Sequence, residues 1–144
     1  MADHNEAVQS WLAGFLNAAG AAAGTVHLHT EGGLRLAAAV NIPPPVQQVV
    51  QWVPSGKGMA GLALERGEPV QTCNLQEDRS GAVKPGARAV NAQAAVAMPV
   101  RDREGAIIAV VGAAWMAERE IQVPELERLQ AAAASVVEIC GAGC

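Results

Sequence analysis

Two pairs of strand-like segments, each joined by a short glycine-containing turn, constrain the fold of this chain most. Thr25 to Thr30 alternate apolar and polar side chains, and after Glu31-Gly32-Gly33 a second strand is predicted over Leu34 to Val40. The apolar segments Ala94 to Val100 and Ala106 to Trp115 flank another such turn. Because so short a turn joins antiparallel neighbours, the sheet is expected to be antiparallel. The predicted fold class is therefore α+β rather than a doubly wound parallel sheet.

Helices are predicted at both ends of the chain and between the two hairpins. Apolar residues at helical spacing indicate a first helix over Asn5 to Ala19 and a last helix that begins at Pro124. Shorter helices are expected over Val46 to Trp52, after three prolines, and over Met59 to Arg66. A short strand is expected over Pro69 to Cys73.

These elements predict a central antiparallel sheet with the N- and C-terminal helices side by side on one face. A pocket is then expected on the opposite face, beneath the middle helices and the irregular segment Asn74 to Asn91. We expect residues 1–144 to form a single domain, with residues 1–4 and 141–144 as flexible tails. The alanine-rich terminal helices suit a homodimer through a four-helix bundle.

The composition argues against several classes of protein. With 51% hydrophobic and 17% charged residues, the chain is too apolar to be mainly disordered. A net charge of -4 without a basic cluster argues against a nucleic-acid partner. No apolar run reaches the roughly 20 residues that cross a bilayer, and the polar start does not have the order of a secretory signal. We therefore expect a cytoplasmic protein without membrane contact, in which 3 cysteines are too few for a disulfide framework.

Four stretches, in this order, resemble the GAF domain family over nearly the whole chain. The first hairpin of that family and its exit into the middle helix resemble GTVHLHTEGGLRLAAAVNIP, and its glycine turn, short helix and edge strand resemble VPSGKGMAGLALERGEPVQTCNLQED. The closing hairpin is similar to AVAMPVRDREGAIIAVVGAAW, and the final helix to VPELERLQAAAASVVE. The resemblance implies a GAF-like fold. Since members bind ligands as different as cyclic nucleotides, bilins, haem and nitrate, the function has to be argued from the site.

We expect the ligand pocket to be lined by residues of both hairpins, the middle elements and the segment before the closing hairpin: His27, Trp52, Cys73, Arg88, Asn91 and Met98. Arginine offers a bidentate fork to an anion, and asparagine offers both a donor and an acceptor. The expected ligand is a small polar or anionic metabolite, and no cofactor is expected. The structural change that ligand binding causes would pass along the sheet to the terminal helices and from there to a signalling partner.

Two local motifs favour structural roles over chemical ones. Gly56 to Gly61 fit the pattern G-x-G-x-x-G, and the amides that begin the next helix are able to hold an anion, but no clear buried strand precedes this turn. His27 and His29 alternate on one strand, so both rings are expected on the same face. A shared metal would need further ligands. We expect instead that one ring lines the pocket and the other lies at the exposed strand end, with no metal site.

Catalysis is not expected. Free methionine sulfoxide reductases of the GAF type, which the chain resembles in size, carry essential cysteines where this chain places Ala60 and about Arg88. Cys73 has no partner cysteine nearby in sequence, so a disulfide-forming cycle lacks its second thiol. The leading hypothesis is a non-catalytic sensory or signalling GAF domain that binds a small molecule. The alternatives are a dimerisation or scaffold module with a filled pocket, and a redox or haem sensor that uses Cys73 or His27.

Overall fold

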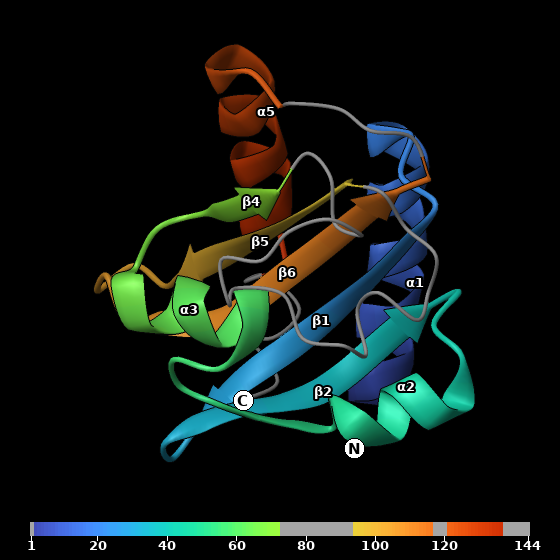
Figure 1. Ribbon diagram of the computed structural model, residues 1–144, viewed down its shortest axis with the longest axis vertical. Coiled ribbons are helices and arrows are strands. Elements are labelled where there is room, and N and C mark those ends of the chain that lie inside the picture. Colours follow the sequence, from blue (N-terminus) through green and yellow to red (C-terminus); the bar gives the residue numbers. More distant parts are fainter. Residues whose placement is uncertain (1, 73–93, 117–120, 137–144) are drawn as a thin grey trace.

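Six antiparallel strands form one sheet in the computed structural model, which describes residues 2–72, 94–116 and 121–136. The strands are β1 (Ala23–Thr30), β2 (Gly33–Val40), β3 (Trp52–Pro54), β4 (Val70–Thr72), β5 (Ala94–Arg101) and β6 (Ile107–Trp115). The helices are α1 (Ala2–Ala19), α2 (Pro44–Val49), α3 (Gly58–Arg66) and α5 (Val123–Ala134). The strand order is β3-β2-β1-β6-β5-β4 (Figure 1). Both predicted hairpins are confirmed, and they meet where β1 pairs with β6.

The turns of the two hairpins follow from their residues. Thr30 pairs with Gly33, which leaves a two-residue turn in which Gly32 adopts a φ of 76°, a value that favours glycine. In the β5–β6 turn, Asp102 Oδ1 accepts hydrogen bonds from the backbone N–H groups of Glu104 (2.9 Å) and Ala106 (3.0 Å). A short aspartate side chain thus supplies the backbone partners that the turn itself lacks.

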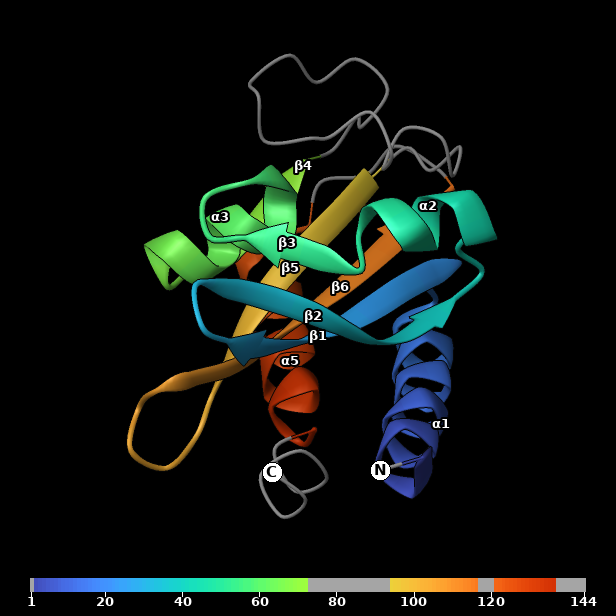
Figure 2. The ribbon, with the colours of Figure 1, turned by 90° about the horizontal axis from the view of Figure 1, so that it is seen from below.

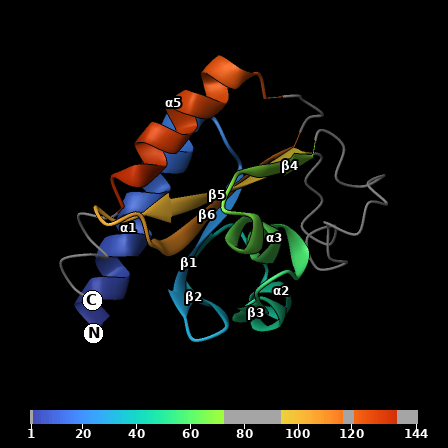
Figure 3. The same cartoon turned by 90° about the vertical axis from the view of Figure 1, so that its left-hand side faces the viewer.

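The helices form two layers, one on each face of the sheet (Figures 2 and 3). The terminal helices α1 and α5 cover one face side by side, as predicted, and Trp11 Nε1–H donates a hydrogen bond to Ser135 Oγ across them (2.8 Å). The larger hydrophobic core lies between these helices and the sheet, where Leu12 and Met98 are fully buried. Helices α2 and α3 lie on the other face, above a smaller core that includes Leu34 and Val110.

Hydrogen bonds from two glutamine side chains link the layer of terminal helices to the sheet. Gln9 of α1 donates from Nε2 to the Ala39 carbonyl (2.6 Å), and its Oε1 accepts from the Ala39 N–H (3.1 Å). Gln71 of β4 makes the same pair of hydrogen bonds with the backbone of Ile121, just before α5, at 3.2 Å each. In both cases the planar amide hydrogen-bonds the N–H and the carbonyl of one residue, as a neighbouring strand would.

The middle of the chain differs from the prediction. The helix expected over Val46 to Trp52 ends at Val49, and Trp52 begins the short strand β3 instead. Val50 leaves the helical conformation, and the Leu36 N–H donates to the Gln51 carbonyl (2.9 Å), so the chain joins the edge of β2. Pairing with an existing sheet edge outweighs one more turn of a short helix.

Other predicted bounds change little or are not tested. The first helix starts at Ala2, earlier than the predicted Asn5, while α3 ends before Gly67 as predicted. The segment Asn74 to Asn91 and residues 141–144 lie outside the described residues. None of the helices within the described ranges is long and apolar enough to span a membrane.

Candidate functional site

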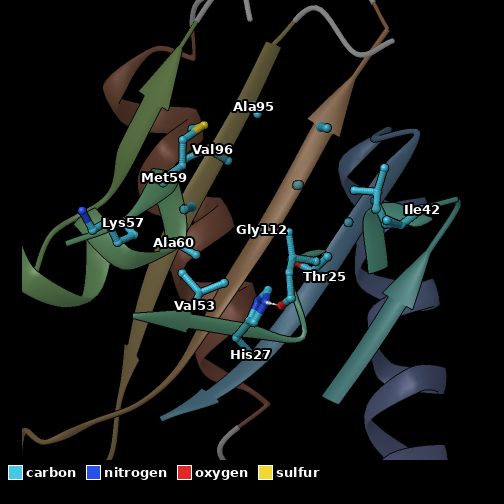
Figure 4. Close-up of a pocket in the computed structure, with 17 residues that line it drawn as sticks. Thr25, His27, Ile42, Val53, Lys57, Met59, Ala60, Ala95, Val96 and Gly112 are labelled. Atoms are coloured by element: carbon cyan, nitrogen blue, oxygen red, sulfur yellow. Dashed lines mark hydrogen bonds between the residues drawn. The ribbon is translucent and has the colours of Figure 1, made fainter. Parts of the chain in front are cut away.

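A cavity of about 150 Å³ lies on the sheet face that α2 and α3 cover. Its floor is formed by β1, β5 and β6, and its roof by α2, β3 and the start of α3 (Figure 4). This is the face on which the sequence predicts the pocket.

The floor is hollow because small residues occupy neighbouring positions on three strands. Gly112 of β6 pairs with Thr25 of β1 on one side and with Ala97 of β5 on the other, and Ala95 pairs with Ala114. Directly paired residues of antiparallel strands project to the same face. A Cβ atom added to Gly112 would lie 3.1 Å from Thr25 Oγ1. The cavity is therefore the volume that larger side chains at these positions would fill.

The roof is apolar. Val46, Val50 and Val53 contribute from α2 and its exit, and Met59 and Ala60 from the first turn of α3. In Figure 4, Val53 and Ala60 point from these elements toward the sheet.

The glycine-rich turn below α3 has a packing role. A Cβ atom on Gly61 would lie 2.5 Å from the Pro54 carbonyl oxygen, so only glycine lets α3 approach the turn so closely. The Gly56 N–H donates to the Gly61 carbonyl (2.8 Å), and the Lys57 N–H donates to the Pro54 carbonyl (3.1 Å). These contacts support the structural interpretation of the G-x-G-x-x-G pattern, because two of its amides are engaged within the turn.

His27 is the buried polar side chain of the cavity. Its side chain is 3% exposed, and Nε2 lies 2.8 Å from the carbonyl oxygen of Val50, the residue that follows α2. A carbonyl oxygen only accepts, so this hydrogen bond requires the proton on Nε2. The ring therefore ties β1 to the exit of α2, which forms part of the cavity roof.

The second histidine of the strand lies in a different environment. His29 is exposed, and its Nδ1 is 2.9 Å from the Ile107 carbonyl oxygen. One ring thus lines the cavity while the other lies at the strand end, as the sequence predicts. Within the described ranges, no three histidine, cysteine, aspartate or glutamate side chains gather as a metal site would require.

The other predicted site residues are not brought together at this cavity. Trp52 lies on the edge strand β3 with 46% of its surface exposed, beside Arg35, and does not line the cavity. Met98 points to the opposite face, into the core under the terminal helices, so its assignment to the pocket is wrong. Its strand is apolar on both faces, and alternation could not show which residues face the ligand. Cys73, Arg88 and Asn91 lie outside the described residues.

Most of the residues that line the cavity were not predicted from the sequence. Thr25, Val53, Met59 and Gly112 line the cavity without having been singled out. One signal was available for Gly112. The register of the closing hairpin places it opposite Ala97, and two adjacent small residues on one sheet face predict a hollow.

Comparisons with known proteins agree with this architecture. A family model for the GAF domain matches residues 2–138. No curated protein matches the chain.

Three solved structures illustrate the likeness in fold. The type II free methionine-R-sulfoxide reductase from Thermoplasma acidophilum is 15% identical with a TM-score of 0.76, and the match covers 95% of this chain and 92% of that one. The GAF domain/HD domain protein from Geobacter sulfurreducens is 12% identical with a TM-score of 0.76, covering 96% and 92%. The GAF domain from a phosphoenolpyruvate-protein phosphotransferase of Coxiella burnetii is 15% identical with a TM-score of 0.75, covering 96% and 80%. At these identities the likeness concerns the fold alone.

Proposed function

Because the chain belongs to the GAF domain family, we propose that it is a non-catalytic sensory module that binds a small molecule in the cavity between the sheet and helices α2 and α3. The observation that carries this proposal is the cavity itself. Adjacent small residues in the floor keep open a volume that the described side chains leave unfilled. Among the described residues, this open volume favours ligand binding over the alternative of a scaffold module with a filled pocket.

The lining favours binding over catalysis. The described residues around the cavity include neither a cysteine nor an acidic side chain, and Ala60 stands where the sequence analysis expects a reductase to carry a thiol. Without a thiol or a carboxyl group among them, the described residues do not supply the thiol chemistry of a reductase, which favours recognition of a ligand over its conversion. The reductase fold of the Thermoplasma acidophilum protein makes turnover the natural counter-test. We expect no methionine to form from free methionine-R-sulfoxide and dithiothreitol, and steady turnover would overturn the non-catalytic proposal.

The test of binding is thermal unfolding of the dialysed protein against a library of small metabolites. A ligand at a hundred times its dissociation constant adds about 2.7 kcal/mol to the free energy of unfolding, which raises the melting temperature by several degrees. In the variant Ala60→Leu, the larger side chain enters the cavity and the shift should disappear. The matched control is Ala13→Leu, on the exposed side of α1, which should respond like the unmodified protein. A hit that survives Ala60→Leu would place binding elsewhere.

The terminal helices are proposed to carry the response to a second copy of the chain. A groove of about 480 Å³ runs between α1 and α5, with the stacked rings of Trp11 and Phe15 on one side and Leu129 on the other. Sedimentation velocity should give a dimer that Ala132→Glu, in the groove, dissociates. Ala131→Glu, exposed on α5 and outside the groove lining, should leave the dimer intact. A monomer already in the unmodified protein would contradict this part of the proposal.

A further inference from the structure

We infer that the ligand of the α2–α3 cavity is a small uncharged molecule that is mostly hydrocarbon, with at most one hydroxyl or carbonyl group. The inference rests on the proposed binding function and narrows the chemistry of its ligand. It differs from the polar or anionic metabolite that the sequence suggests, because that expectation depends on Arg88 and Asn91, which lie outside the described residues, whereas this inference uses the described lining.

The chemistry of the described lining carries this inference. Aliphatic side chains form the roof, and alanine and glycine form most of the floor (Figure 4). Dispersion contacts and removal of apolar surface from water are therefore the main interactions on offer. Thr25 adds one hydroxyl group, which is able to donate one hydrogen bond and to accept hydrogen bonds.

The charged and ionisable groups of the lining do not make it an anion site. Lys57 is exposed, and in Figure 4 its ammonium group points away from His27 and Thr25. The Nε2–H of His27 is already donated to Val50. A carboxylate inside the cavity would lose its hydration without gaining a charge-paired partner from these residues, which disfavours an ionised ligand.

The volume limits the size of the buried part of the ligand. An aliphatic cavity of about 150 Å³ in another protein holds benzene. The cavity here has a volume of about 150 Å³. A ring or branched chain of about six to eight non-hydrogen atoms therefore fits, with a polar group directed at Thr25.

The experiment compares neutral and charged probes of the same shape. Benzyl alcohol and cyclohexanol are titrated into isotope-labelled protein at neutral pH, alongside benzoate and cyclohexanecarboxylate, and dissociation constants are taken from backbone amide shifts. The alcohols should bind about tenfold or more tightly than the carboxylates, since burial penalises the charge. Ala60→Leu should weaken the alcohols by a similar factor, while Ala13→Leu should not.

The outcomes separate this inference from the function on which it rests. If the carboxylates bind as tightly as the alcohols and Ala60→Leu abolishes both, the uncharged ligand class is overturned and the binding function stands. If no probe binds, or Ala60→Leu and Ala13→Leu behave alike, the uncharged class is also overturned. A metabolite whose thermal shift is lost in Ala60→Leu would then still support the binding function, whereas a flat screen would remove it.

Discussion

Gly24 should be one of the least replaceable residues of the chain. It lies on β1 beneath α1, where a Cβ atom would be 2.6 Å from the Gly112 carbonyl oxygen and 2.7 and 3.0 Å from the two δ carbons of Leu16. The first contact is with the backbone of β6, which cannot retreat without disturbing its hydrogen bonds to β1. In Gly24→Ala, movement of α1 and the buried Leu16 away from the sheet would relieve the second contact and leave the first in place.

The loss in free energy of unfolding in Gly24→Ala can be compared with the effect of the same substitution at Gly14. Overpacking a core position by one methyl group costs about 1–3 kcal/mol, and we expect Gly24→Ala near the upper end because a backbone oxygen is involved. Gly14 lies within α1 with no atom within 4 Å of an added Cβ. In Gly14→Ala, the higher helix propensity of alanine should add about 0.5–1 kcal/mol to the free energy of unfolding. The same substitution should therefore lower the free energy of unfolding at Gly24 and raise it at Gly14.

Urea denaturation, followed by circular dichroism, measures both variants. The two midpoints should lie on opposite sides of that of the unmodified protein, with a difference of about 3–4 kcal/mol in the free energy of unfolding between the variants. Equal stability of Gly24→Ala and the unmodified protein would refute the close packing of α1 on β1. A loss of stability in Gly14→Ala would refute the description of this residue as an exposed helical position.

Three further predictions use the same denaturation assay. Gln9→Glu should lower the free energy of unfolding by about 1–2 kcal/mol, because a carboxylate cannot donate to the Ala39 carbonyl. Gln48→Glu, at an exposed position, is the control, and equal effects of the two substitutions would contradict the paired hydrogen bonds. Leu12→Ala should cost about 2–5 kcal/mol from the fully buried core, against about 0.5 kcal/mol or less for Val123→Ala, which is 65% exposed; a small loss at Leu12 would mean that α1 is not packed as described. Asp102→Ala should cost about 1–2 kcal/mol, whereas Asp102→Asn keeps the accepting oxygen and should cost less; the reverse order would exclude the turn hydrogen bonds as the cause.

Some features of the cavity could be predicted from this sequence, and others could not. The face of the sheet on which the cavity lies could be predicted, since the amphipathic helices at both termini cover the opposite face. His27 could be placed at the pocket because β1 alternates and one of its two histidines had to lie near the strand centre. Met98 could not be placed, because β5 carries apolar residues on both faces and the sequence has no period that separates them.

Trp52 is a second case in which local pattern was insufficient. After three prolines the sequence suits a helix, and the helix does form, but it ends at Val49. Beyond its end, Gln51 accepts a hydrogen bond from Leu36 of β2, the strand that precedes the helix, and the pairing of β3 with β2 places Trp52 at the outer edge of the sheet. Local propensity therefore predicted the element correctly and its end incorrectly, because its end depends on a partner from elsewhere in the chain.

The sequence by itself determined the hairpins, the antiparallel class of the sheet and the two amphipathic helices. Each of these depends on residues close together in the chain: Gly32 in a two-residue turn, Asp102 in the second, and apolar residues at helical spacing. Only the tertiary structure decided the cavity. Its floor combines Thr25, Ala97 and Gly112 from three strands, and its roof depends on how far α3 can approach through Gly61. A hollow is a property of the space between elements, and that space is fixed by contacts between residues far apart in sequence.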